Sequence, residues 1–185
     1  MNISEPQRYL GAVDVEALSQ CILSQDVNAW KEQLNRQQSY EVHKDTESIV
    51  MLFCDETWPD GDVHREVGWE RIANQAMPLI NDIIETYYNP GGIVLRAMAA
   101  KLKSGGRISP HTDALQSFHM GHRIHVPITT NEAVRFMIEG KPYKFEVGHA
   151  YEINNQKTHS VMNMSKEDRI SFIFDYVPPD LIKNK

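Results

Sequence analysis

Residues 134–147, with the sequence VRFMIEGKPYKFEV, predict a β-hairpin. Apolar side chains occupy every second position on both sides of residues 139–142, EGKP, which have the composition of a turn. A period of two places these apolar side chains on one face of each strand. The stretch therefore predicts antiparallel β structure for this part of the chain.

The same period continues through the second half of the sequence. Ile124, Val126 and Ile128 alternate with polar or proline positions, and further extended stretches cover 93–102 and 169–177. A short strand is also expected at 150–153. Short strands separated by glycine turns favour a β-barrel, sandwich or jelly roll.

The first half of the sequence has a helical pattern instead. Apolar residues recur at three- and four-residue steps between Trp69 and Tyr87, which predicts a helix that packs on a sheet. Pro78 falls inside this pattern and is expected to kink the helix or to divide it. A shorter helix is expected after Asp14, and the apolar run 48–54 predicts a buried strand.

Size and composition predict one domain of the α+β class, mainly β, over residues 1–185. Residues 1–92 form a supporting region of helices and a strand, and 93–180 form the β core. The formal net charge of −6 argues against binding to nucleic acid, which normally requires a basic surface. No run of 18 apolar residues is present, so no membrane-spanning helix is expected.

Two further features predict a cytoplasmic protein. The N-terminal residues 1–11 lack the basic and apolar regions of a secretory signal. Cys21 and Cys54 are the two cysteines, and their spacing fits neither a disulfide framework nor a thiolate zinc site.

Residues 110–113, with the sequence PHTD, contain the clearest chemical signal. In an extended segment residues two apart point to the same side, so His111 and Asp113 can bind one metal ion together. A third ligand is available from His159, which follows the predicted hairpin. Two histidines and one carboxylate leave coordination positions open, an arrangement that suits non-haem Fe(II) and an oxygenase.

A second group of polar residues lies on the predicted strands. Arg169 and Ser171 share one face of the last strand, and Arg123 and His125 share one face of another. These groups can converge on a dicarboxylate co-substrate, because the planar fork of arginine binds a carboxylate through two hydrogen bonds. The alternative for either arginine is a surface salt bridge.

Further segments join these motifs in a fixed order and spacing. They are Gly105, Ile108–Asp113, Arg123–Pro127, Gly148, Glu152–Asn155, His159–Val161, Asn163 and Arg169–Tyr176. With them, the region from Ile93 to Asp180 resembles the aspartyl/asparaginyl β-hydroxylase family of Fe(II)- and 2-oxoglutarate-dependent oxygenases. The resemblance implies a double-stranded β-helix, of the jelly-roll or cupin-like kind, with N-terminal helices packed on one sheet.

The resemblance also implies roles for individual residues. His111, Asp113 and His159 are the expected iron ligands. Arg169 is expected to pair with the distal carboxylate of 2-oxoglutarate, with Ser171 in the RxS pattern of such enzymes. The same resemblance places two further residues, Arg123 and His125, near the carboxylate that chelates iron.

Two departures separate this sequence from the animal transmembrane members of the family. Those members have glycine where this chain has Asp113, and serine where it has Ala100. The sequence therefore looks like the bacterial-type branch with a full triad.

The implied reaction consumes O₂ and hydroxylates an unactivated C–H bond, with release of succinate and CO₂. The implied substrate is an amino acid, a peptidyl Asp/Asn-type residue or a small metabolite. Candidate substrate-binding residues are Arg107, Gln116, His119 and His122. The connection 114–122 is either a lid over the substrate or an exposed loop.

Two other functions remain open on the same fold. One is a cupin-like metalloenzyme that does not use 2-oxoglutarate, and the other is a non-enzymatic sensor. The fold alone does not distinguish these functions from that of an oxygenase. Only the residues of the site can do so.

Overall fold

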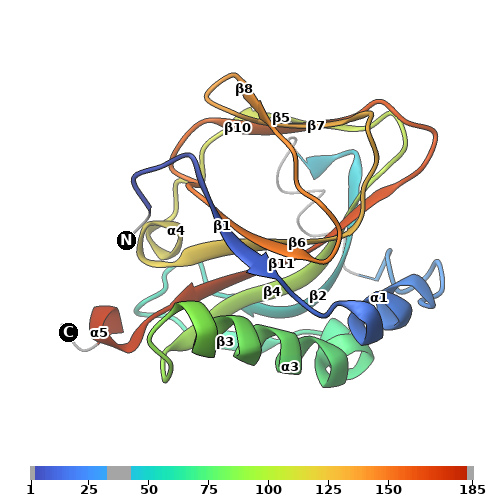
Figure 1. The fold of residues 1–185 in the computed structure, drawn as a ribbon. Helices are drawn as coiled ribbons and strands as arrows, with labels where there is room; N and C mark the ends of the chain where they lie inside the picture. The colour runs from blue at the N-terminus through green and yellow to red at the C-terminus, as the bar shows by residue number, and fades with distance from the viewer. Residues whose placement is uncertain (1–2, 33–42, 183–185) are drawn as a thin grey trace.

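The computed structural model describes residues 3–32 and 43–182 and shows two β-sheets that face each other (Figure 1). The larger sheet has seven strands and the smaller sheet has four. Neighbouring strands are antiparallel throughout both sheets. This arrangement is the double-stranded β-helix that the sequence predicts.

The strands and helices have the following bounds. The larger sheet contains β1 (Gln7–Ala12), β2 (Thr46–Cys54), β3 (Val63–Arg65), β4 (Ile93–Leu102), β6 (His122–Thr129), β9 (His149–Ile153) and β11 (Arg169–Val177). The smaller sheet contains β5 (Arg107–His111), β7 (Val134–Ile138), β8 (Lys141–Tyr143) and β10 (His159–Asn163). The helices are α1 (Glu16–Leu23), α3 (Gly68–Tyr87), α4 (Gln116–Met120) and α5 (Pro179–Ile182).

Strand order explains how the two halves of the sequence form one sheet. The larger sheet has the order β1-β9-β6-β11-β4-β2-β3, and the smaller sheet has the order β5-β10-β7-β8. Strands β1, β2 and β3 precede residue 93 and still belong to the larger sheet. In Figure 1, α1 and α3 lie below this sheet and the smaller sheet lies above it.

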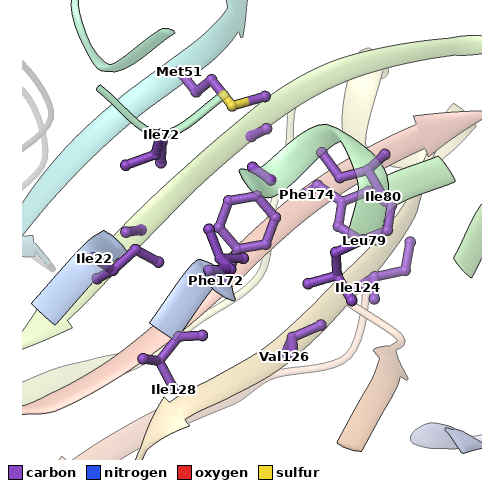
Figure 2. Close-up of a cluster of buried hydrophobic side chains, with 14 of the residues drawn as sticks. Ile22, Met51, Ile72, Leu79, Ile80, Ile124, Val126, Ile128, Phe172 and Phe174 are labelled. Atoms are coloured by element: carbon purple, nitrogen blue, oxygen red, sulfur yellow. The ribbon is translucent and has the colours of Figure 1, made fainter. Parts of the chain in front are cut away.

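The hydrophobic core lies between the larger sheet and its helices. Ile80 of α3, Ile124 of β6 and Phe172 of β11 are fully buried in one cluster. Figure 2 shows these side chains together with Val126 and Phe174. Because side chains alternate along a strand, the residues between them on β6 and β11 point toward the smaller sheet. The larger sheet thus has an apolar outer face, which packs on the helices, and an inner face that can carry the polar side chains of a site.

Helix α3 runs without interruption from Gly68 to Tyr87, so the prediction that Pro78 divides it is wrong. Proline has no N–H group, so the carbonyl of Asn74 lacks its usual helical hydrogen bond. Pro78 and Asn74 both lie at exposed positions. Water can bond that carbonyl, and the buried apolar face continues on both sides of the proline.

The predicted hairpin is confirmed, but its turn is shorter than the composition indicated and its second strand ends at Tyr143, before Phe145 and Val147. Glu139 and Gly140 both have positive φ, at 49° and 75°, as a two-residue hairpin turn of the primed type requires. Ile138 pairs with Lys141 and Met137 with Pro142, so strand β8 begins inside the expected turn. Proline is tolerated there because β8 is the edge strand of its sheet.

Both cysteines are free thiols. Within residues 3–32 and 43–182, no helix combines the length and the apolar character needed to cross a membrane.

Replacing Phe172 by alanine is expected to lower the free energy of unfolding by about 3–5 kcal/mol, because a large buried ring leaves a cavity. Denaturant unfolding followed by circular dichroism measures this change. Met162→Ala is the control, since Met162 is 40% exposed and its loss is expected to change stability by less than about 0.5 kcal/mol. Equal effects of the two substitutions would contradict the assigned core.

Candidate functional site

His111, Asp113 and His159 converge between the two sheets. His159, the first residue of β10, pairs in register with His111, the last residue of β5. The two imidazole rings have centroids 4.3 Å apart, and Nε2 of His111 lies 3.8 Å from Oδ1 of Asp113. One potential ligand atom from each residue lies within 4.8 Å of the other two. The spacing lets all three residues reach a single ion.

Backbone carbonyls orient both histidine rings. Nδ1 of His111 lies 2.8 Å from the Ser109 carbonyl oxygen, and Nδ1 of His159 lies 3.0 Å from the Lys157 carbonyl oxygen. A carbonyl only accepts, so each Nδ1 carries the proton and donates it. Each Nε2 is left with its lone pair, which is the form that binds a metal.

The charge states of these groups also suit a metal. Burial raises the pKa of Asp113, but electrostatic interactions, above all with the guanidinium of Arg123, outweigh burial and lower that pKa overall. Burial lowers the pKa of His159. An ionised carboxylate and a neutral imidazole are the ligand forms that a divalent ion requires.

Arg123 forms an ion-paired chain behind the triad. Its Nε and Nη2 atoms lie 2.8 Å from Oδ1 and Oδ2 of Asp175, a two-pronged pair between β6 and β11. Its Nη1 atom lies 2.9 Å from Oδ2 of Asp113. Burial lowers the pKa of Arg123, but the two carboxylates outweigh burial and raise it. The sequence analysis placed this arginine beside the co-substrate. In the structure its nitrogens instead contact two carboxylates of the protein, those of Asp113 and Asp175.

Three other predicted residues have buried polar atoms without partners. Arg169 is 4% exposed, and its Nε has no hydrogen-bond partner among the described residues. Within the same residues, the hydroxyl of Ser171 and both ring nitrogens of His125 also lack a partner. Burial lowers the pKa of Arg169 to about 10. Burial, together with the charges of Arg169 and Arg123, holds the pKa of His125 well below its usual value.

Arg169 is therefore a buried cation that lacks a compensating anion. Among the described residues no carboxylate forms an ion pair with it. A buried, uncompensated charge is costly, and the cost disappears when a ligand supplies the opposite charge.

Two adjoining cavities reach the triad. The larger, of about 600 Å³, is lined by Phe53, Arg96, Met98, Leu115, Phe118, Ile173 and residues of the triad. The smaller, of about 50 Å³, is lined by residues that include Ala100, His125, His159 and Arg169. His111 and Ile173 line both cavities, so the triad lies where they meet.

The four predicted substrate-binding residues lie elsewhere, and none of them is among the residues that line these two cavities. Arg107, Gln116 and His119 are exposed. From the connection that holds two of them, Leu115 and Phe118 reach the larger cavity instead.

His122 belongs to a buried cluster around Glu152. Its Nδ1 lies 2.6 Å from Oε1 of this fully buried carboxylate. Oε2 of Glu152 accepts from the hydroxyl of Tyr88 at 2.9 Å and from Arg8 at 2.8 Å. The cluster ties β1, β6 and β9 to the end of α3.

Sequence reasoning missed Arg96, Phe118 and Asp175. The alternation of strand residues held the signal for two of them, since Asp175 shares a face of β11 with Arg169 and Arg96 shares a face of β4 with Ala100. Phe118 lies on a five-residue helix whose direction no periodic pattern indicates.

A sequence model of the aspartyl/asparaginyl β-hydroxylase family matches residues 18–179. The chain belongs to this family. The resemblance noted from its motifs is thus confirmed over most of its length, and the protein is an oxygenase of the hydroxylase kind. No sequence among the curated proteins matches the chain.

Solved structures with the same fold have low sequence identity to the chain. A prolyl hydroxylase from Trichoplax adhaerens, in complex with a peptide fragment of the hypoxia-inducible factor oxygen degradation domain, is 12% identical with a TM-score of 0.60. The alignment covers 98% of this chain and 88% of that one. A viral collagen prolyl hydroxylase from Paramecium bursaria Chlorella virus-1, in complex with 2-oxoglutarate, is 10% identical with a TM-score of 0.54, over 95% and 97% of the two chains. The non-haem monooxygenase ThoJ, in complex with nickel, is 14% identical with a TM-score of 0.56, over 95% and 75%.

Replacing His122 by alanine is expected to reduce stability by about 1–3 kcal/mol, because buried Glu152 loses a hydrogen-bond donor. Binding of a divalent metal is expected to stay unchanged. Thermal unfolding and metal titration measure the two effects, with the exposed His119→Ala as control for both. Weaker metal binding in the His122 variant with no loss of stability would contradict this structural role.

Proposed function

We propose that this hydroxylase uses Fe(II) and 2-oxoglutarate to insert one oxygen atom of O₂ into an unactivated C–H bond. The observation that carries the proposal is the buried guanidinium of Arg169, which has no anionic partner within the described residues and lines the same cavity as His111 and His159 of the His-Asp-His cluster. A dicarboxylate can bind the metal ion through one end and supply the missing anionic partner of Arg169 through its other carboxylate.

The residues fit an Fe(II) ion. His111 and His159 offer neutral imidazole nitrogens, and Asp113 offers a carboxylate oxygen. Two histidines and one carboxylate are the donor set of non-haem Fe(II) oxygenases, because three ligands leave positions for a co-substrate and O₂.

The residues also fit 2-oxoglutarate. Arg169 would hold the distal carboxylate through charge-assisted hydrogen bonds, and the unpartnered hydroxyl of Ser171 would donate to the same group. His125, with its unpartnered ring, would contact the carboxylate nearer the metal. Each of these buried polar groups would then have the partner that it lacks in the protein alone.

When bound, iron and 2-oxoglutarate supply the redox chemistry: one atom of O₂ enters the substrate as hydroxyl, the other enters succinate, and the C1 carboxyl leaves as CO₂. The chain itself holds and orients the reactants. His111, Asp113 and His159 fix the metal, Arg169 fixes the long axis of the co-substrate, and the apolar walls exclude water. No side-chain general base is required for this reaction.

The larger cavity is the proposed substrate site. Its volume of about 600 Å³ suits an amino acid, a side chain of a peptide or a small metabolite. A peptide substrate has a precedent in the Trichoplax prolyl hydroxylase, which has the same fold and was solved with a peptide.

Arg169→Ala is expected to weaken 2-oxoglutarate binding by about tenfold or more, because charge-assisted hydrogen bonds contribute about 1.5–3 kcal/mol each. Metal affinity is expected to be retained. Calorimetry measures Mn(II) binding to the metal-free protein and 2-oxoglutarate binding to the Mn(II)-loaded protein. Arg169→Lys, which keeps the charge without the planar fork, should give an intermediate affinity for 2-oxoglutarate. Parallel loss of metal and 2-oxoglutarate binding would show that Arg169 is structural.

His159→Ala is expected to lower the affinity for Fe(II) by at least about tenfold, because the ion loses one of three protein ligands. Anaerobic metal titration measures the change. His64→Ala is a matched control on exposed strand β3. An unchanged stoichiometry and affinity in the His159 variant would remove this residue from the metal site.

The whole proposal is tested by succinate formation from 2-oxoglutarate. Protein loaded anaerobically with Fe(II) is exposed to O₂ with and without a panel of amino acids and short peptides. Iron-dependent turnover, stimulated by one panel member, is the expected result. Absence of both turnover and 2-oxoglutarate binding would refute the proposal in favour of a metalloenzyme without 2-oxoglutarate or a sensor.

A further inference from the structure

We infer that the larger cavity binds its substrate through a carboxylate group held by Arg96, at the opposite end of the barrel from Arg169. This inference rests on the proposed function, because it assumes that 2-oxoglutarate occupies the Arg169 end. Arg96 lies on β4, outside the motifs that connect the chain to its family.

Strand register separates two cationic ends of the inner face. Arg169 pairs with Leu102 at one end of β11, and Asp175 pairs with both Arg96 and Arg123 near the other. Six residues of strand span about 20 Å, so the two ends lie far apart. The triad lies at the junction of the cavities that lead to each end, and each end can therefore bind a separate anion.

Arg96 and Arg123 compete for one carboxylate, and Arg123 has the better geometry. Arg123 lies 2.8 Å from each oxygen of Asp175, whereas the shortest contact of Arg96 to this carboxylate is 3.4 Å. The other hydrogen bond of Arg96, at 2.8 Å, goes to the neutral hydroxyl of Ser117.

Arg96 therefore has unused capacity for an anion. A guanidinium has five N–H donors, and within residues 3–32 and 43–182 two of those of Arg96 have partners, at the distances given above. Its Nε is buried and has no partner in that part of the chain, and the side chain as a whole is 2% exposed. Arg96 lines the larger cavity, where a substrate carboxylate would meet these donors.

The walls of the cavity define the rest of the substrate class. Phe118 contacts both guanidiniums, with its ring centroid 4.1 Å from Cζ of Arg96 and 4.5 Å from Cζ of Arg123. Met98, Leu115 and Ile173 add apolar surface. The site thus fits a compound with one carboxylate on an apolar body, such as an amino acid or an acidic peptide side chain, in preference to its amide.

The test uses pairs of ligands of nearly equal shape, one with a side-chain carboxylate and the other with the corresponding amide. Wild-type protein is loaded with Mn(II), which does not turn over, and saturated with 2-oxoglutarate so that the Arg169 end is occupied. N-acetyl-aspartate amide and N-acetyl-asparagine amide are then titrated by calorimetry, followed by the corresponding glutamate and glutamine pair. At least one carboxylate is expected to bind about tenfold or more tightly than its amide, as a charge-assisted hydrogen bond predicts.

Variants assign the preference to Arg96. Arg96→Gln should abolish the discrimination and leave metal and 2-oxoglutarate affinities unchanged, and Arg96→Lys should retain part of it. Arg65→Gln is the control, because Arg65 stacks on Trp69 at the outer edge of the larger sheet. If Arg96→Gln does not fold, Arg96→Lys and the wild-type ligand pairs decide the question.

The outcomes separate this inference from the proposed function. Failure of wild-type protein to bind 2-oxoglutarate refutes the proposed function independently of any substrate. Intact 2-oxoglutarate binding with amides bound as tightly as carboxylates, with no carboxylate bound, or with the preference unchanged in Arg96→Gln overturns this inference alone. In that case Arg96 has a structural role, through its stacking on Phe53 and Phe118 and its hydrogen bonds to Ser117 and Asp175.

Discussion

The alternation of side chains along β4, β6 and β11 is the constraint on which the rest of the structure depends. One face of these strands packs on α3, and the other face holds the charged groups of the site. A shift of one residue in register would exchange the two faces. Burial of residues such as Phe172 and Phe174 therefore does more than stabilise the fold, because it also determines where Arg169 and Asp175 point.

The buried ion pairs are better explained by orientation than by stability. Removing two charges from water costs about as much as their attraction returns, so Asp175 and Arg123 add little to the free energy of folding. Their two-pronged contact instead fixes the Arg123 side chain, and this arginine directs Oδ2 of Asp113 away from His111. Oδ1 of Asp113 is left on the side of the two histidines, where a metal would bind.

The sequence was most informative where one local pattern decides the structure. The bounds of β4 and β11 agree with the predicted strands, and the spacing of His111, Asp113 and His159 along the chain correctly indicated that they converge. The residues that line the substrate cavity were harder to predict, because a local pattern does not show which side chains of a loop point inward. His122 was a candidate for substrate binding, and in the structure its partner is Glu152, which is distant in sequence. Likewise, the pairing of Arg96 with Asp175 depends on strand register across the sheet.

The two sheets have different parts in this site. The smaller sheet and the residues that follow β5 supply His111, Asp113 and His159, whereas the larger sheet supplies the three arginines. Metal affinity therefore depends on the pairing of β5 with β10. The proposed recognition of anions depends on β4, β6 and β11. Because separate strands carry these two properties, substitutions at Arg96 would, on this proposal, change which substrate is bound while the metal ligands keep their positions. Specificity can thus vary among related chains that share the same metal chemistry.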